Sequence, residues 1–442
     1  MRYHIFTFGC QMNVCDSWWL DRALKSRGFI PAAEEEADFF ILNTCSVREK
    51  PEQKVYSLLG RLQEYTRERP HVFAAVGGCV AQQVGRGFLK RFPFVRLVFG
   101  TDGLVMAPDA LHRLASNPGR KLSLLDFSEM YPEREQALPE HMPAQAFVNI
   151  MQGCDNFCAY CIVPYTRGRQ KSRASGEVLR ECREMVEKGA KEITLLGQNV
   201  NSYGRDKYGD GTDFATLLYM IAEIPGLRRL RFTTSHPKDI APEVIRAFGD
   251  LPVLCPHLHL PVQSGSDRVL KAMGRKYDRD SYLRTVDSLR RACPDISLTT
   301  DIIVGFPGET EEDFLQTMDL IRRAGFESSF SFKYCDRPGV RACRMQPKVE
   351  EEIKSERLAR LQKSQEELSR QALNARVGGR ATVLVETRNE RPRTGEMQWR
   401  GRDGGNRVVN IAVESAQDLT GKEVEVKIIQ AKKHSLIGEV LP

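Results

Sequence analysis

Three cysteines lie close together in the segment GCDNFCAYCIVPYTRG, which runs from residue 153 to residue 168. Cys154, Cys158 and Cys161, here called the central set, are spaced C-x3-C-x2-C. Three thiolates can hold a 4Fe-4S cluster and leave its fourth iron without a protein ligand, so that this iron is open to a substrate. A structural zinc site would need a second pair of ligands nearby, and the flanking sequence has none. The alternative is three unrelated buried thiols.

A second group of cysteines, here called the amino-terminal set, is spread over the first part of the chain. Cys10 follows the strand-like segment HIFTFG, Cys45 follows DFFILNT, and Cys79 follows FAAVGG. Because the carboxyl ends of parallel strands share one edge of an open α/β sheet, these thiolates are expected to converge there. The alternative is three separate small buried residues. Cys15 has no counterpart after the other strands and is expected to be a helix-start or packing thiol, the alternative being a competing iron ligand.

The elements that must position these cysteines fall into three regions of an α/β protein. Residues 1–118 alternate strand-like and helical patterns, including a helix from Asp16 to Ser26, and predict an amino-terminal parallel α/β domain. Around residues 126–144 the sequence is acidic and contains proline without apolar periodicity. Residues 119–139 are therefore assigned to a linker.

The central region, residues 140–371, contains six strand candidates, most of them separated by helical segments. This pattern predicts an incomplete β/α barrel with a partial (β/α)6 arrangement. The charged stretch 349–373 has i,i+4 pairs such as Glu350 with Lys354 and is expected to form a solvated connecting helix. Residues 373–442 carry short alternating strands and predict a small antiparallel β-barrel. The strand candidates of the central region are residues 146–151, 192–197, 229–234, 257–262, 297–305 and 330–334.

Length and composition restrict the class of protein. A chain of 442 residues is long for a single core and leaves room for an enzyme of several domains. No apolar run approaches the roughly 18 residues that a membrane span needs, and the first residues lack the features of a signal peptide, so a cytoplasmic protein without membrane contact is expected. Twelve cysteines in a reducing compartment indicate metal or redox chemistry. The net charge of +7 is compatible with RNA as a partner.

The cysteine motifs and their surroundings resemble the radical S-adenosylmethionine (SAM) methylthiotransferase family over essentially the whole chain. The resemblance implies an amino-terminal domain whose cysteine set ligates an auxiliary 4Fe-4S cluster. It also implies a radical-SAM core, in which the open iron at the central set chelates SAM, and an RNA-binding TRAM domain. The segments that carry the resemblance are FGCQMNVCDS, LNTCSVREK, GGCVAQ, IVPYTRGRQKSR, LLGQNVNSYG, TSHP, HLPVQSGSDRVLKAMGRKY and DIIVGFPGETEEDF.

Within this family, Gln11-Met12-Asn13 and residues 163–168 are most similar to the MiaB-type enzymes, which modify N6-isopentenyladenosine beside the tRNA anticodon. The resemblance implies methylthiolation of C2 of that base, with one SAM as methyl donor and a second as radical source. The implied partners are tRNA, a flavodoxin- or ferredoxin-like electron donor, and an iron–sulfur or sulfur carrier protein. Two alternatives remain open, namely methylthiolation of an aspartate of a ribosomal protein and a non-enzymatic iron–sulfur protein that binds RNA.

Residues that follow the strands of the predicted barrel are candidates for holding SAM, because active sites form at the carboxyl ends of barrel strands. Arg275 and Lys276 are further candidates for a SAM carboxylate or an RNA phosphate, and an ordinary solvated role is the alternative. Tyr160 matches the aromatic position that flanks the adenine of SAM in the family. The strand-end candidates are Gln198, Asn199, Ser235, Gln263 and the segment from Gly305 to Glu309.

The final barrel is expected to hold the RNA backbone. Residues 373–442 contain 12 Lys and Arg against 9 Asp and Glu, which gives a net charge of +3. Trp399 lies among arginines and is a candidate platform on which a base stacks. The alternative is a solvated loop face with one packing tryptophan. The arginines are Arg388, Arg391, Arg393, Arg400, Arg402 and Arg407.

Overall fold

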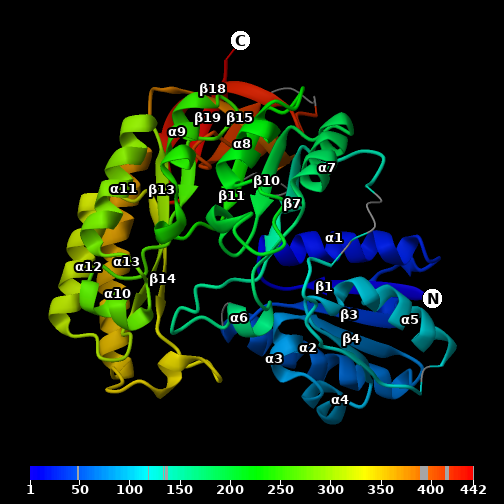
Figure 1. Cartoon of the computed structure of the whole chain (residues 1–442). Coiled ribbons are helices and arrows are strands. Elements are labelled where there is room, and N and C mark those ends of the chain that lie inside the picture. The colour runs from blue at the N-terminus through cyan, green and yellow to red at the C-terminus, as the bar shows by residue number, and fades with distance from the viewer. Residues whose placement is uncertain are drawn as a thin grey trace.

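A computed structural model of the chain describes residues 1–46, 49–117, 119–132, 134, 138–388, 397–413 and 418–441. The elements form three units, an amino-terminal sheet with its helices, a central half-barrel, and a small closed barrel at the carboxyl terminus. Figure 1 shows the carboxyl-terminal barrel, in red, on the other side of the central unit from the amino-terminal sheet, in blue. In the described part of the chain, no helix is both long and apolar enough to cross a membrane.

The amino-terminal unit is a six-stranded parallel sheet with helices on both faces. Successive residues of a strand point to opposite faces. Phe39 and Ile41 therefore pack with one set of helices, while Phe40 and Leu42 pack with the other. In sheet order the strands are β2 (Ile30–Pro31), β1 (Arg2–Thr7), β3 (Phe39–Thr44), β4 (Phe73–Gly78), β5 (Val95–Phe99) and β6 (Leu122–Leu124). The helices are α1 (Gln11–Lys25), α2 (Glu49–Glu68), α3 (Cys79–Val84), α4 (Gly87–Arg91) and α5 (Ala107–Ser116).

Two expectations for this unit are corrected. Strand β6 lies inside residues 119–139, for which the sequence predicts a linker, and pairs with β5 from Leu97 opposite Leu122. Its three residues are too few for a visible apolar pattern. Helix α1 begins at Gln11 rather than Asp16, because the chain turns into the helix directly at Cys10.

The central unit has six parallel strands in two hydrogen-bonded sheets of three, and strands β11 and β12 lie in contact where the two sheets meet. This arrangement confirms the partial β/α barrel. The strands are β7 (Gln145–Asn149), β10 (Glu192–Leu196), β11 (Arg229–Thr233), β12 (His257–His259), β13 (Ser297–Val304) and β14 (Ser328–Lys333). The helices are α7 (Ser175–Glu187), α8 (Phe214–Ala222), α9 (Pro242–Asp250), α10 (Asp267–Met273), α11 (Arg279–Ala292), α12 (Glu311–Ala324) and α13 (Glu351–Asn374).

Helix α13 is more than a solvated connection. It packs along β14 and α12, and its buried positions include Arg357, Leu361 and Gln365. The Gln365 amide donates to the carbonyl oxygen of Phe326 at 2.8 Å. The many charged residues of this segment predict its exposed face correctly, but they conceal its narrow buried stripe.

The carboxyl-terminal unit is a closed barrel in the order β15-β16-β17-β19-β18. Trp399, Val409 and Val426 belong to its core. One pairing differs from the antiparallel expectation, because β17 and β19 run parallel from Val409 opposite Leu436. The strands are β15 (Arg380–Arg388), β16 (Met397–Arg402), β17 (Val408–Val413), β18 (Glu423–Ala431) and β19 (Leu436–Val440).

This small barrel is fastened to the amino-terminal ends of the central strands. Arg229, the first residue of β11, is 5% exposed and donates to the carbonyl oxygens of Arg402 at 2.8 Å and Thr382 at 2.9 Å. Arg231, 6% exposed, donates to the carbonyl oxygen of Gly404 at 2.9 Å. The carboxyl ends of the strands, where barrel active sites form, therefore lie at the end of the half-barrel away from this contact.

Candidate functional site

The amino-terminal cysteine set lies at the carboxyl ends of three neighbouring strands. Cys10 caps α1 after β1, Cys45 directly follows β3, and Cys79 begins α3 after β4. Because β1, β3 and β4 are adjacent in the sheet, the three cysteines share one edge, as the sequence predicts. Cys45 and Cys79 are 2% and 4% exposed.

Close backbone approach at this edge depends on glycine. Gly9 has a φ of 103°, and a Cβ atom on it would lie 2.6 Å from the sulfur of Cys45. Asn13 of α1 ties the same edge together, because its Nδ2 donates to the carbonyl oxygen of Thr44 at 2.8 Å. A hydrogen bond from Cys45 lowers the pKa of Cys10 to about 6, with burial acting against it and the charge of Arg167 helping.

The central set lies in a loop that leaves the half-barrel. Two short antiparallel strands, β8 (Met151–Gln152) and β9 (Lys171–Ser172), form the base of this loop. The loop also contains the short helix α6 (Val163–Thr166). Gly153 allows its sharp start, because a Cβ atom there would lie 2.0 Å from the carbonyl oxygen of Arg169. Cys154 and Cys161 are partly buried, and Cys158 is 8% exposed.

Two nitrogen groups face Cys158. Nη1 of Arg275 lies 3.5 Å from its sulfur, and Nε2 of His236 lies 4.0 Å from it. Burial lowers the pKa of His236 to about 2, and the nearby charges of Arg275 and Lys238 add to this effect, so its imidazole is neutral at neutral pH. Burial raises the pKa of Cys154 to about 11 and that of Cys161 to about 12. Their ligation would therefore release protons.

Each cysteine set offers the three thiolate ligands that a 4Fe-4S cluster with one open iron requires. A 4Fe-4S cube takes each thiolate on a different iron, so its ligands need not converge on one point. The donor chemistry of the two cysteine sets therefore suits such clusters.

Gln198, which follows β10, joins the two cysteine sets. Its Oε1 accepts a hydrogen bond at 2.6 Å from the backbone N–H of Gly153, directly before Cys154. Its Nε2 contacts the sulfur of Met12, two residues after Cys10. Arg167 makes a second connection, because it belongs to the central loop and donates to Oδ1 of Asn13 at 3.1 Å. The two sets therefore lie on either side of one interface between the units.

The ends of the central strands carry buried polar atoms that have no hydrogen-bond partner among the described residues. These atoms are Oδ1 of Asn149, Oδ1 of Asn199, Oγ1 of Thr234 and Oγ of Ser235. A buried polar group without a partner costs free energy unless a ligand or water completes it. The strand ends after β7, β10 and β11 therefore have the unfilled hydrogen-bonding capacity that a polar ligand such as SAM would satisfy.

Tyr160 and Gln263 also lie at this end of the half-barrel. The hydroxyl of Tyr160 is 3.4 Å from Nη1 of Arg275, and burial raises its pKa. Gln263 has a φ of 72°, and its backbone forms an isolated parallel β-bridge with Ile302 of β13. Arg275 and Lys276 are both candidates for binding a SAM carboxylate or an RNA phosphate. Arg275 is 5% exposed and faces Cys158, whereas Lys276 is exposed.

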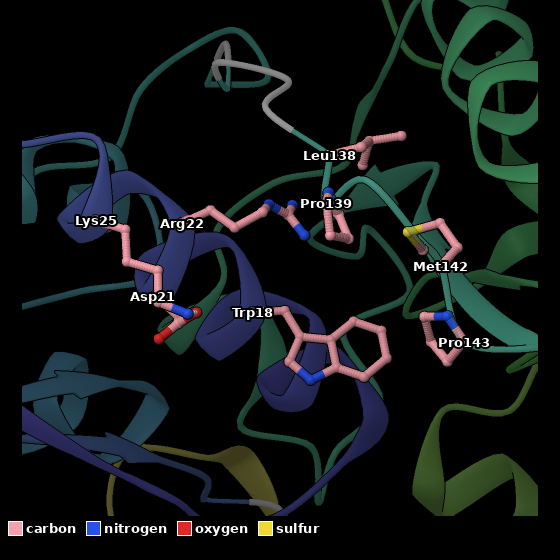
Figure 2. Close-up of a pocket in the computed structure, with 8 residues that line it drawn as sticks. All are labelled: Trp18, Asp21, Arg22, Lys25, Leu138, Pro139, Met142 and Pro143. Atoms are coloured by element: carbon pink, nitrogen blue, oxygen red, sulfur yellow. Dashed lines mark ion pairs between the residues drawn. The ribbon is translucent and has the colours of Figure 1, made fainter. Parts of the chain in front are cut away.

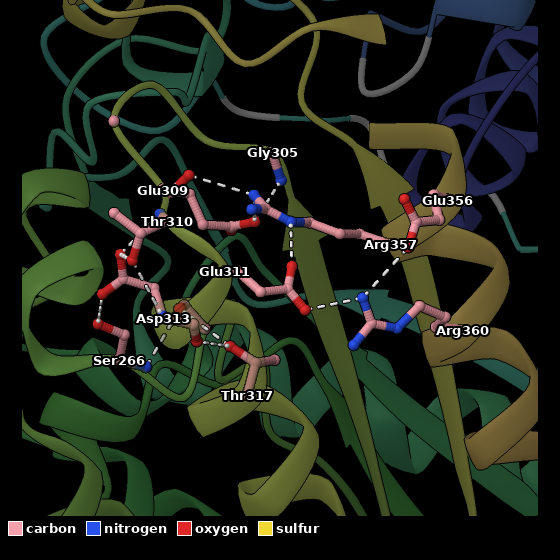
Figure 3. Close-up of polar contacts among 12 residues, drawn as sticks. Ser266, Gly305, Glu309, Thr310, Glu311, Asp313, Thr317, Glu356, Arg357 and Arg360 are labelled. Carbon is pink, nitrogen blue, oxygen red and sulfur yellow. Dashed lines mark hydrogen bonds and ion pairs between the residues drawn. The ribbon is translucent and has the colours of Figure 1, made fainter. Parts of the chain in front are cut away.

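Glu309 acts on the backbone of its own loop. Its Oε1 accepts a hydrogen bond at 2.9 Å from the N–H of Gly305, and it pairs with Arg357 of α13 at 2.9 Å (Figure 3). Burial raises the pKa of Glu309 against the opposing effects of Gly305 and Arg357. Gly305 is confined by α13, since a Cβ atom on it would lie 2.3 Å from Cγ of Lys354. Helix α13 therefore fixes the shape of the loop after β13 through these contacts.

Two residues expected to bind RNA are buried in the structure. Trp399 is 4% exposed within the barrel core, so the prediction of a stacking platform is wrong. Arg407 is 9% exposed and pairs with Glu327 of the central unit at 2.6 Å and with Asp403 at 3.0 Å, so it fastens the barrel instead. Alternation along β16 could have indicated the inward position of Trp399.

The other arginines of that group differ in their surroundings. Arg388 and Arg400 are exposed, on neighbouring strands β15 and β16. Arg402 is partly buried and pairs with Glu386 at 2.9 Å. Arg391 and Arg393 lie outside the described residues.

A pocket of about 420 Å³ lies on another side of α1, between this helix and the segment 138–143 (Figure 2). It contains none of the predicted site residues. Its lining consists of Trp18, Asp21, Arg22, Lys25, Leu138, Pro139, Met142 and Pro143. Cys15 of the same helix contacts β7, where its sulfur lies 3.4 Å from Nδ2 of Asn149, and it is a packing thiol as expected.

Three residues of the site escape prediction from the sequence. His236 follows β11 in the TSHP segment, and its place beside a strand end was the available signal. Arg167 stands inside a family motif that assigns it no separate role. Arg134 lies in the segment expected to be a linker, yet its Nη2 donates to Oδ1 of Asp16 at 2.9 Å.

Comparison with known proteins gives three regional matches. Residues 148–321 match the Radical SAM superfamily, residues 2–100 match the Uncharacterized protein family UPF0004, and residues 374–441 match the TRAM domain. These regions correspond to the central, amino-terminal and carboxyl-terminal units of the fold.

Curated relatives match along the whole chain. A protein of Nitratidesulfovibrio vulgaris named tRNA-2-methylthio-N(6)-dimethylallyladenosine synthase is 61% identical, over 99% of this chain and 98% of its own length. A protein of Oleidesulfovibrio alaskensis with the same name is 57% identical, with the same two coverages. Among solved structures, the radical S-adenosylmethionine methyltransferase TsrM from Kitasatospora setae has a TM-score of 0.56 at 14% identity, over 77% of this chain and 76% of that one. That likeness concerns the fold alone.

Proposed function

The chain belongs to the tRNA-2-methylthio-N(6)-dimethylallyladenosine synthases, a family of radical SAM enzymes, and we propose that it methylthiolates C2 of N6-isopentenyladenosine beside the tRNA anticodon. SAM serves both as methyl donor and as radical source. The observation that carries this proposal is the placement of two separate three-cysteine sets on either side of one interface, joined by Gln198.

The proposal places a 4Fe-4S cluster and SAM at the central set. When bound, this pair supplies a carbon radical for removing the unactivated C2 hydrogen, which a side-chain base does not remove at neutral pH. The protein positions the reactants. Arg275 and His236 direct their nitrogens at Cys158, and the partnerless polar atoms after β10 and β11 are suited to hold SAM.

The proposal assigns a second 4Fe-4S cluster to Cys10, Cys45 and Cys79 as the place of the transferred sulfur. Its support is the placement of three cysteines at one sheet edge and the glycine at position 9, which leaves room beside Cys45. The partners that we propose besides tRNA are a flavodoxin- or ferredoxin-like electron donor and an iron–sulfur or sulfur carrier protein. We place this chemistry in the cytoplasm, where tRNA is modified.

The loop of the central set also offers a surface for an RNA base. Phe157 and Tyr165 are 42% and 50% exposed, and their rings meet edge to face with centroids 6.3 Å apart. The guanidinium of Arg169 lies 5.1 Å from the centroid of the Phe157 ring. Exposed aromatic rings beside a cation are suited to stacking single-stranded bases. We assign this surface to a nucleotide next to the modified one, and backbone contacts to the carboxyl-terminal barrel.

Nucleoside mass spectrometry of tRNA from a strain lacking this protein tests the activity. We expect 2-methylthio-N6-isopentenyladenosine to disappear and N6-isopentenyladenosine to accumulate, with both changes reversed by the intact gene. Unchanged methylthio nucleoside would overturn the proposal. A mass deficit in a ribosomal protein of the same strain would instead favour the alternative substrate.

A further inference from the structure

Arg167 brings a buried positive charge from the central loop into the amino-terminal cysteine site. It is 4% exposed, and it follows α6 only six positions after Cys161. Its Nη2 donates to the neutral amide of Asn13 at 3.1 Å. Oδ1 of the same Asn13 lies 3.5 Å from the sulfur of Cys10. One residue therefore separates the guanidinium from the sulfur of Cys10.

Among the residues that the structure describes, the charges around this position do not balance. Among the described residues, Asp16 is the carboxylate that forms ion pairs with Arg167, at 3.9 Å, and with Arg134, at 2.9 Å. Asp16 is 5% exposed, and the side chains of Arg167 and Arg134 are 4% and 15% exposed. One described carboxylate thus faces one buried and one partly buried cation. A buried charge without an opposite charge is costly, so an anion is expected in this place.

An iron–sulfur cluster on the amino-terminal set has the required sign. Three thiolates around a 4Fe-4S core of about +2 give a net charge of about −1, before any further ligand binds the open iron. Arg167 reaches this set through Asn13, whose Oδ1 lies 3.1 Å from Nη2 of Arg167 and 3.5 Å from the sulfur of Cys10. The charge deficit and the cysteine set therefore occupy the same place.

We propose that Arg167 is the counter-ion of the auxiliary cluster and, as a positioning residue, raises the reduction potential of that cluster. The inference rests on the second cluster of the proposed function. Net charge and hydrogen bonding at a cluster set its potential, and a nearby cation favours the reduced, more negative form. Because Arg167 belongs to the loop that carries the central set, the radical-SAM unit itself supplies this charge to the other site.

The test is a redox titration of protein in which Cys154, Cys158 and Cys161 are replaced by Ala. Electron paramagnetic resonance monitors the reduced cluster during the titration. This background leaves the auxiliary cluster as the single expected signal. Arg167→Gln should lower the potential enough to change the ratio of oxidised to reduced cluster at least tenfold, about 59 mV for one electron. Arg167→Lys should keep most of the wild-type potential. Asp16→Asn, which removes a negative charge, should shift the potential in the opposite direction.

The outcomes separate this inference from the proposed function. Absence of iron from the background protein would contradict the second cluster itself. About four irons with equal potentials in the parent, Arg167→Gln and Asp16→Asn proteins would overturn the role of Arg167 while leaving the cluster in place. If Arg167→Gln fails to assemble, an unshifted potential in Asp16→Asn would still overturn the inference, because a charge change at this position would then not reach the cluster. Shifts of the same sign in all three variants would also overturn it.

Discussion

Arg229 and Glu423 form an ion pair at 2.9 Å between the first residue of β11 and the first residue of β18. Neighbouring Arg228 contacts the same carboxylate at 3.2 Å, but its side chain is 65% exposed whereas that of Arg229 is 6% exposed. The two arginines therefore contact the same carboxylate, one from an exposed position and the other from a buried one. They provide a matched test of how the carboxyl-terminal barrel is held.

Arg229→Ala is expected to destabilise the protein by about 3–5 kcal/mol, because it leaves buried partners without their cation. Arg228→Ala should cost about 0–1 kcal/mol, as is usual for an exposed ion pair. Limited proteolysis and thermal unfolding of the two iron-loaded variants measure the difference. Equal losses would show that the contact at the base of β11 does not fasten the barrel.

The same contacts argue against testing RNA binding by deleting residues 373–442. Deletion would expose Arg229 and Arg231, which are buried against the small barrel. Point substitutions at Arg388 and Arg400 leave these contacts intact. Replacing both by Ala should weaken tRNA binding and reduce the slope of log affinity against log salt by about 0.7–0.9 for each phosphate that the protein no longer neutralises.

Arg407→Ala is the contrasting variant in that experiment. Since Arg407 pairs with Glu327 and Asp403, its loss should lower stability without a matching change in the salt slope. The measurement is tRNA affinity at several salt concentrations, with iron content checked in each protein. An unaltered slope in the Arg388 and Arg400 double variant would remove these arginines from RNA recognition.

Phe157→Ala and Tyr165→Ala test the aromatic surface beside the central set. Each is expected to weaken binding of an anticodon stem-loop by about 1–3 kcal/mol, the usual value of one stacked base. Leu315→Ala serves as a control, because Leu315 is 49% exposed but lies on α12. If only the response to the electron donor changed and RNA affinity stayed constant, the surface would be a docking site for that protein.

Two substitutions of Glu309 distinguish a direct role of its carboxylate in SAM binding from an indirect role through the shape of the loop. In the structure its oxygen holds the N–H of Gly305, so Glu309→Gln, which keeps an oxygen acceptor, should retain most of the SAM affinity. Glu309→Ala should lose it together with the shape of the loop. Equilibrium dialysis with SAM measures both. A large loss in Glu309→Gln would mean that the carboxylate charge itself is required.

The cysteine positions could be predicted because they depend on local order alone. A strand that ends in cysteine, repeated three times in a parallel sheet, must place the thiols on one edge, and β1, β3 and β4 are indeed neighbours. Strand β6 was not predictable in this way, since Leu122–Leu124 forms a strand only through pairing with β5. Local pattern gives no sign of such a pairing partner.

Charge partners were the least predictable part of the site. Arg407 resembles an RNA-binding arginine in the sequence because its neighbours are basic, whereas its partner Glu327 is 80 positions away. The same holds for Arg167, whose role follows from Asn13 and Asp16 of another unit. Such pairs are decided by how the units dock, which composition and spacing do not encode.

The most direct test of the account compares two triple variants in which each cysteine set is replaced by Ala. Both reconstituted proteins should hold about four irons, against about eight in the intact chain. The variant lacking Cys10, Cys45 and Cys79 should still form 5′-deoxyadenosine from SAM under reducing conditions but make no methylthio product on tRNA. The variant lacking the central set should do neither. Methylthiolated tRNA from the first variant would contradict the assignment of the sulfur site to the amino-terminal set.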